Sequence, residues 1–146
     1  MSTNPGDPIF FLTTTSVSTN VLVHMKAQTL TKQELEIMKI VWRLENATVR
    51  DVYETLLGQR RIAYTTVMTM MKILEQKRYL KKRLKDRAYV YEPARPKDQV
   101  IKSMVQEFVN RVFNGSAEPL LMHLVKDRYL SEKDLRAITR MIEESE

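Results

Sequence analysis

The hydrophobic period of the chain changes near residue 79, and this change constrains the fold more than any other feature. Between residues 31 and 77, apolar side chains recur every three to four positions, which predicts amphipathic helices. The next stretches, "YLKKRLK" and "AYVYEP", alternate with a period of about two and are separated only by Asp86 and Arg87. That pattern predicts a β-hairpin. Three helices followed by a basic hairpin is the element order of a winged helix-turn-helix.

Local start and stop signals place these three helices. The stretch Thr31–Glu34 is a capping box, which begins a helix that we expect to end near Leu44. Thr48 can cap a second helix, and Gly58 can end it. The third helix is expected at about Tyr64–Lys77, within the stretch "AYTTVMTMMKIL".

The third helix carries two different faces. Its apolar side comprises Val67, Met70, Met71 and Leu74, and its opposite side comprises Thr65, Thr69, Lys72 and Gln76. Threonine is β-branched and a mediocre helix former, so helix propensity does not explain its presence. The polar side is either a solvated surface or a surface that contacts hydrogen-bonding groups of a partner, and this segment alone leaves both readings open.

The positive charge of the chain is concentrated around the predicted hairpin. The net charge is +6, but residues 59–95 contain eleven cations and three acids, an excess of eight. From Ser116 to the end, five cations face seven acids. A basic segment joined to an acidic one is typical of a polyanion-binding module attached to a second module.

Residue types that build most active sites are scarce. The 146 residues include no cysteine, two histidines and three glycines. The composition excludes disulfides and thiolate metal sites, and it argues against a histidine-rich centre or a phosphate-cradling loop. We therefore expect a protein that is not an enzyme and that needs no metal or cofactor. The lack of cysteine is compatible with a cytoplasmic protein.

Helical periodicity resumes after Pro96. A long helix is expected in "KDQVIKSMVQEFVNRVFNG", a short one begins with Pro119 in its first turn, and a last one is capped by Ser131. Three short helices cannot bury this much apolar surface among themselves, so we expect a homodimerisation domain. The predicted interface residues are Ile101, Met104, Val105, Phe108, Val112, Leu135, Ile138 and Ile142.

Three segments follow from these patterns. Residues 1–28 are rich in Ser, Thr, Asn and Pro and are expected to form a disordered arm, with addition of a strand to the dimer as the alternative. Residues 29–95 form the winged helix domain, and residues 96–146 the helical dimerisation domain. The arm lacks the features of a signal peptide, and no apolar run approaches the roughly 18 residues that a membrane span needs. The expected fold class is mainly α with a small β-hairpin.

The sequence from about Leu30 to Glu144 resembles the BlaI/MecI family of penicillinase repressors, which control β-lactamase and methicillin resistance. The stretches that carry the resemblance are "LTKQELEIMKIVW", "TVRDVYETL", "AYTTVMTMMKILEQKRYLKK", "DRAYVYEPA", "FVNRVFNGS" and "LVKDRYLSEKDLRAITRMIEE". The resemblance implies a cytoplasmic homodimer that represses transcription from a palindromic double-stranded DNA operator. It also implies release after cleavage by a membrane-bound sensor protease, in response to a signal such as a β-lactam. A branch that senses copper through carboxy-terminal cysteines does not fit this chain.

The resemblance makes the third helix a recognition helix. Threonine offers a hydroxyl and a methyl group at short reach, which suits the donors, acceptors and thymine methyl of the major groove. Thr65 and Thr69 are the expected base readers, and Thr66 and Lys72 lie nearer the phosphates. The complete set of predicted DNA-binding residues is Arg61, Tyr64, Thr65, Thr66, Met68, Thr69, Lys72, Arg83, Lys85 and Arg87.

Some of these residues have a second interpretation. Each hairpin cation can be a solvated charge, and Trp42 and the three methionines at 68, 70 and 71 are expected in the core, although Met68 can also touch a base. A winged helix can also serve as a protein-docking module without DNA binding. The basic hairpin and the hydroxyl-rich helix face favour DNA, because a docking module more often exposes an apolar face.

The cleavage motif of the family is not kept. Well-known members are cut between Asn and Phe in the short middle helix, and the matching pair here is His123 and Leu124. A protease that requires Asn before the bond should cut this chain poorly. Two alternatives follow: a sensor protease of altered specificity, or release by another signal.

Overall fold

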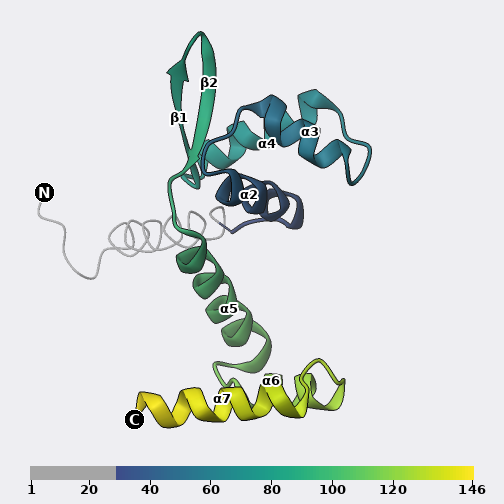
Figure 1. Ribbon diagram of the computed structural model, residues 1–146, viewed down its shortest axis with the longest axis vertical. Helices are drawn as coiled ribbons and strands as arrows, with labels where there is room; N and C mark the ends of the chain where they lie inside the picture. Colours follow the sequence, from purple (N-terminus) through teal and green to yellow (C-terminus); the bar gives the residue numbers. More distant parts are fainter. Residues whose placement is uncertain (1–28) are drawn as a thin grey trace, which may run out of the picture. The chain divides into compact units, whose positions relative to one another are not determined.

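The computed structural model describes residues 29–146 (Figure 1). The predicted arm and its alternative strand fall on residues 1–28, outside the described residues. The chain divides into two compact units, the first ending at Gln99 and the second comprising Val100–Glu146. Among the described residues, no helix combines the length and the apolar character that crossing a membrane requires.

The first unit has the predicted order of three helices and a hairpin. Its elements are α2 (Lys32–Leu44), α3 (Val49–Leu57), α4 (Tyr64–Gln76), β1 (Leu80–Lys85) and β2 (Ala88–Pro93). The strands pair antiparallel, from Leu80 opposite Pro93 to Lys85 opposite Ala88. Ala47, between α2 and α3, forms an additional bridge with Tyr91 of β2, which ties the base of the hairpin to the helices. This is a winged helix-turn-helix.

Side-chain caps explain where the helices begin. The Thr31 hydroxyl accepts from the Glu34 amide, and the Glu34 carboxylate accepts from the Thr31 amide, as predicted. Thr48 caps α3 in the same way with Asp51. Gly58 does end α3, but in a right-handed conformation (φ −65°), so the freedom of glycine is not what stops the helix there.

The core of the first unit joins all of its elements. Fully buried side chains include Ile37 and Met38 of α2, Leu56 of α3, Met71 of α4 and Leu80 of β1. Two leucines of these helices are exposed, namely Leu44 and Leu57, although the helical period places both on the apolar faces of α2 and α3. Each is the last residue of its helix, and the end of the helix extends beyond the side chains that form the core.

The second unit consists of helices whose apolar sides stay open. The chain enters it through α5 (Lys97–Phe113) and continues with α6 (Glu118–Lys126) and α7 (Glu132–Ser145). Pro119 lies in the first turn of α6, and Ser131 caps α7 through a box with Asp134, as predicted. Gly115, at φ +87°, follows α5 in the left-handed region that glycine tolerates. No residue of α6 or α7 is buried.

Two helices, one in each unit, end in the same way on the tripeptide Arg-Tyr-Leu. After α4, Arg78 has φ +64° and the Tyr79 amide donates to the Leu74 carbonyl. After α6, Arg128 has φ +60° and the Tyr129 amide donates to the Leu124 carbonyl. Both are Schellman-type ends in which arginine occupies the position that glycine usually takes.

Candidate nucleic-acid interface

All ten predicted DNA-binding residues lie in the first unit, and all ten are exposed. The orientation of α4 follows from its apolar face, since Val67, Met70, Met71 and Leu74 are buried as predicted. The threonines and Lys72 therefore project outward from the unit. The core interpretation of Met68 was wrong, because it lies on the flank of the helix with 47% of its surface exposed.

The hydroxyl of Thr69 has a partner within the helix. Its Oγ1 donates to the Thr65 carbonyl oxygen at 2.9 Å. This bond orients the side chain and uses its only proton, so the lone pairs of Oγ1 and the methyl group are what Thr69 presents outward. Such a group accepts a hydrogen bond from a base amino group or contacts a thymine methyl.

The beginning of α4 has no side-chain cap. Its N-cap residue is Ala63, whose side chain cannot accept from the first amides of the helix. Tyr64 packs edge to face against Tyr53 of α3 with ring centroids 5.3 Å apart, which fixes the side chain at this end. Arg61 is exposed just before the helix. Free amides beside a cation can bind an anion such as a phosphate, and the alanine at the N-cap position was the sequence signal for this feature.

An ion pair at the other end of α4 was not foreseen. Lys77 Nζ lies 2.9 Å from Glu34 Oε2 and 3.0 Å from the Thr29 carbonyl oxygen. Glu34 is 6% exposed and also caps α2, so one carboxylate holds both the start of α2 and the end of the recognition helix. The two residues are 43 positions apart, and no local pattern predicts their pairing.

The hairpin turn places two charged residues in the left-handed region. Asp86 has φ +49° and Arg87 has φ +68°, as a type I′ turn requires. The turn confirms the predicted two-residue connection. Lys85 and Arg87 are exposed at the tip of the hairpin, and among the described residues neither forms an ion pair.

The base of the hairpin is electrostatically different from its tip. Arg83 Nε lies 2.6 Å from Glu92 Oε1, and Lys81 Nζ lies 3.9 Å from Glu92 Oε2. On the other face, Lys82 Nζ lies 3.2 Å from Glu75 Oε2 of α4, and this hydrogen bond raises the pKa of Lys82. The hairpin formed by β1 and β2 is the wing of the winged helix. Three of its cations are therefore already paired with carboxylates.

Trp42 holds the segment that precedes α5. It was expected in the core and is only half-buried. Its indole Nε1 donates to the Arg95 carbonyl oxygen at 3.0 Å. The Arg95 guanidinium in turn lies 4.5 Å from the centroid of the Tyr79 ring. The chain is thus held against the winged unit immediately before α5 begins.

None of the predicted dimerisation residues is buried within the single chain. Val105, Phe108, Val112 and Ile142 are exposed by 40–57%, and the other four are half-buried. Beyond the residues predicted for the interface, the second unit exposes further apolar side chains, namely Leu121, Met122, Val125, Tyr129 and Met141. These residues also recur with helical spacing in the sequence. The helices are too short for that spacing to show which apolar side chains form an interface.

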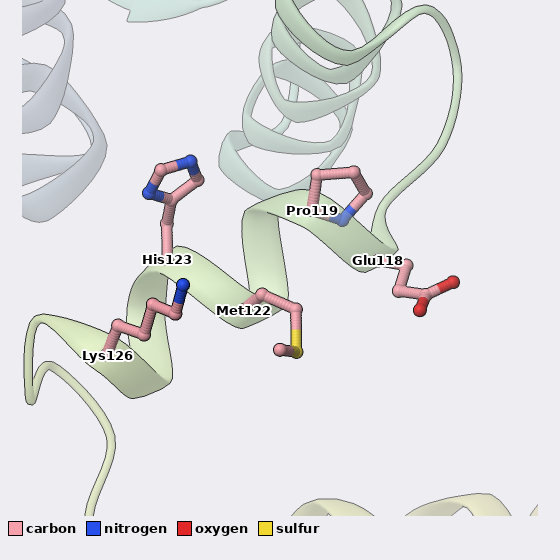
Figure 2. Close-up of a pocket in the computed structure, with 5 residues that line it drawn as sticks. All are labelled: Glu118, Pro119, Met122, His123 and Lys126. Atoms are coloured by element: carbon pink, nitrogen blue, oxygen red, sulfur yellow. The ribbon is translucent and has the colours of Figure 1, made fainter.

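The pair His123 and Leu124 lies inside α6. His123 is exposed and lines a shallow pocket on this helix with Glu118, Pro119, Met122 and Lys126 (Figure 2). Its carbonyl oxygen accepts from the Asp127 amide at 2.9 Å, and Leu124 is half-buried. No group of three potential metal ligands comes together in the described part of the chain.

Comparison with known proteins assigns the family. The sequence pattern of the family described as penicillinase repressor matches residues 30–144. The chain belongs to this family. It is a DNA-binding transcriptional repressor and not an enzyme, and this sets aside the alternative of a docking module without DNA binding.

Individual relatives agree with this assignment. The chain is 35% identical over 115 residues to the transcriptional regulator BlaI of Mycobacterium tuberculosis, covering 77% of this chain and 82% of that protein. It is 25% identical over 111 residues to the penicillinase repressor of Bacillus licheniformis, covering 76% and 87%. Among solved structures, it is similar to monomeric Bacillus licheniformis BlaI in complex with the blaP half-operator, with 26% identity, a TM-score of 0.43, and coverage of 48% and 85%.

Proposed function

We propose that this repressor acts as a homodimer on a palindromic operator, with α4 of each subunit in the major groove of one half-site. The observation that carries the proposal is the outward face of α4, where Thr65, Thr69 and Lys72 are exposed above a fully formed core. Thr65 and Thr69 read base edges there. Thr69 acts as an acceptor, because its proton is committed to the Thr65 carbonyl.

Phosphate contacts surround the outward face of α4. Arg61, Tyr64 and the free amides of the first turn bind the backbone at the start of α4, and Thr66 and Lys72 bind it along the helix. The wing contributes Lys85 and Arg87, whose charges are unpaired among the described residues, and Met68 contacts a base or sugar at the flank of α4. Arg83 is the weakest candidate, because Glu92 already holds it.

The open apolar faces of the second unit support the homodimer. Three helices with no buried residue in α6 or α7 require a partner surface, and a second copy offers the same faces. Two linked half-site readers gain affinity through effective concentration, so dimerisation and operator binding are coupled.

Selection of duplexes from a random pool, followed by binding titrations against salt, tests this proposal. We expect the selected site to be a palindrome whose half-sites are one helical turn or a multiple of it apart. The logarithm of affinity should fall with the logarithm of salt with a slope of about −0.9 per phosphate contact. Selection of a non-palindromic site, or a slope near zero, would contradict the proposal.

We further propose that cleavage between His123 and Leu124 releases the operator, through a membrane sensor protease with a specificity that differs from Asn-Phe. A cut there separates α7 and half of α6 from α5. The subunits would lose dimer contacts, and binding at both half-sites would weaken together. The bond lies in a helical turn, so cleavage requires that turn to open first. Incubation with membranes that contain the cognate sensor and inducer should yield a fragment beginning at Leu124 by mass spectrometry. Cleavage elsewhere, or release of DNA from an intact chain, would refute this assignment.

A further inference from the structure

Glu92 has an unusual position in a strand pair that is otherwise basic. It lies directly opposite Lys81 and diagonally from Arg83, and all three side chains lie on one face of the hairpin. Both cations point to its carboxylate, Arg83 at 2.6 Å through Oε1 and Lys81 at 3.9 Å through Oε2. The next cation on the same face, Lys85, lies opposite Ala88 and has no such partner among the described residues.

This arrangement divides the wing into a base whose cations share a carboxylate and a tip whose cations do not. A phosphate that approached Arg83 would have to replace the Glu92 carboxylate, so binding would exchange one anion for another instead of adding a new contact. The remaining Glu92 charge would then lie close to that phosphate and repel it. A phosphate that binds Lys85 or Arg87 displaces no carboxylate and meets no such repulsion.

The consequence differs between operator and random DNA. In a non-specific complex, the protein can shift on the duplex until each free cation finds a phosphate, because that binding is almost wholly electrostatic. In the operator complex, base contacts from α4 fix the register, and a cation adds affinity only if a phosphate lies within its reach. Pairing these two cations with the Glu92 carboxylate therefore lowers non-specific affinity more than operator affinity.

We propose that Glu92 is a specificity-determining residue that holds Arg83 and Lys81 off the DNA backbone, confines the phosphate contacts of the wing to its tip, and thereby suppresses binding to non-operator DNA. This inference rests on the proposed function, in which the wing lies on DNA. It assigns Arg83 a role opposite to that of Lys85 and Arg87, although the three cations occupy every second position of the sequence.

The test compares two variants that remove the same charge from the hairpin. Glu92→Gln frees Arg83 and Lys81, whereas Asp86→Asn removes a carboxylate that has no ion pair among the described residues and keeps a residue type that tolerates φ +49°. Both are titrated by fluorescence anisotropy with random-sequence duplex and with the selected operator at several salt concentrations. Thermal unfolding checks that each variant is folded.

For Glu92→Gln we expect affinity for random DNA to rise roughly three- to tenfold at 0.1 M salt, with a salt slope steeper by about 0.9 per freed cation. Operator affinity should rise less. Asp86→Asn should leave the slope unchanged. Adding Arg83→Gln to Glu92→Gln should reverse most of the gain, whereas Arg83→Gln alone should change the parental slope by much less than one contact.

Equal slopes for Glu92→Gln and Asp86→Asn would overturn the inference, as would loss of a full phosphate contact from Arg83→Gln alone. These outcomes are separable from failure of the proposed function. If the parental protein shows no salt dependence at all, the DNA interface itself is wrong. If the parental slope is steep and only the Glu92 effect is missing, the interface stands and the role of Glu92 does not.

Discussion

The two units of this repressor use similar numbers of helices with opposite results. In the first unit, α2, α3 and α4 enclose side chains that are fully buried, such as Ile37, Val52 and Met71. In the second unit, α6 and α7 bury nothing, and Met141 and Ile142 remain 69% and 57% exposed. The hairpin accounts for part of the difference, because Leu80 and Tyr91 close the core of the first unit from the side.

This difference supports the proposal that the first unit is a domain that folds alone and that the second unit contributes one half of a dimer interface. Burial of apolar surface stabilises each fold, at about 25 cal/mol per Å² removed from water. The first unit obtains that stabilisation alone, whereas under the proposed function the second unit obtains it with a partner subunit. Stability should therefore be independent of protein concentration in the first unit and dependent on it in the second.

Removing the second unit should give the largest effect. A fragment ending at Lys102 retains Arg95, which Trp42 holds, and Val100, the buried residue of α5. It should fold and sediment as a monomer, and its affinity for the palindrome should fall by roughly 10²–10⁴ because the effective-concentration gain is lost. Binding to an isolated half-site should match that of the parental subunit. A fragment that sediments as a dimer would break the comparison.

Truncation of a core side chain should have a nearly equal effect, but on the free energy of unfolding instead of on DNA affinity. Leu56 is fully buried, so Leu56→Ala should lower the free energy of unfolding of the first unit by about 2–5 kcal/mol. Denaturant titration should give the same loss at every protein concentration. Phe108→Ala is the matched change in the second unit, and its effect should instead raise the dimer dissociation constant. Concentration-independent destabilisation by Phe108→Ala would contradict this distinction.

Thr69→Val should separate base reading from phosphate binding within the first unit. It preserves shape but removes the lone pairs of Oγ1, so operator binding should weaken by about 1–3 kcal/mol if that oxygen accepts from a base. Random-sequence binding should hardly change. Thr69→Ser, which keeps the oxygen and removes the methyl group, distinguishes the two contacts. An equal loss on operator and random DNA would remove Thr69 from the list of readers.

The smallest predicted effect is at the hairpin tip, where stability and binding should change in opposite directions. Arg87 has φ +68°, so Arg87→Gly should relieve backbone strain and stabilise the first unit by roughly 0.5–1 kcal/mol. The same change removes a phosphate contact and should reduce the salt slope by about 0.9. Asp86→Gly, at φ +49°, relieves strain without removing a cation. A salt slope that Asp86→Gly and Arg87→Gly reduce equally would argue against Arg87 on the backbone.

Much of the fold could be predicted because its signals are local. Thr31, Thr48 and Ser131 cap their helices as expected, and the change of period locates the hairpin to within one residue. The burial of α4 followed from a single helical wheel. These features depend on residues three or four positions apart, which the sequence displays directly.

The remaining features depend on residues that are distant in the chain. Lys77 and Glu34 pair across 43 positions, and Trp42 bonds to Arg95 across 53. The cations of the wing looked equivalent in sequence, and only the register of the strands shows that Glu92 reaches Arg83. The helix that was expected to end near Leu44 does end there, but Leu44 itself is exposed, because a periodic pattern does not show where the core stops.

The Arg-Tyr-Leu ends of α4 and α6 have a genetic consequence. Every arginine codon becomes a glycine codon through a single change of its first base, so Arg78→Gly and Arg128→Gly are within easy mutational reach. Each would replace a strained left-handed arginine with the residue that favours this conformation. Because proteins stand close to their stability threshold, a gain of about 1 kcal/mol changes the amount of folded protein in a cell several-fold. Neither arginine is among the predicted base readers, so alleles of this kind would raise the dosage of the repressor while leaving its reading of DNA unaltered.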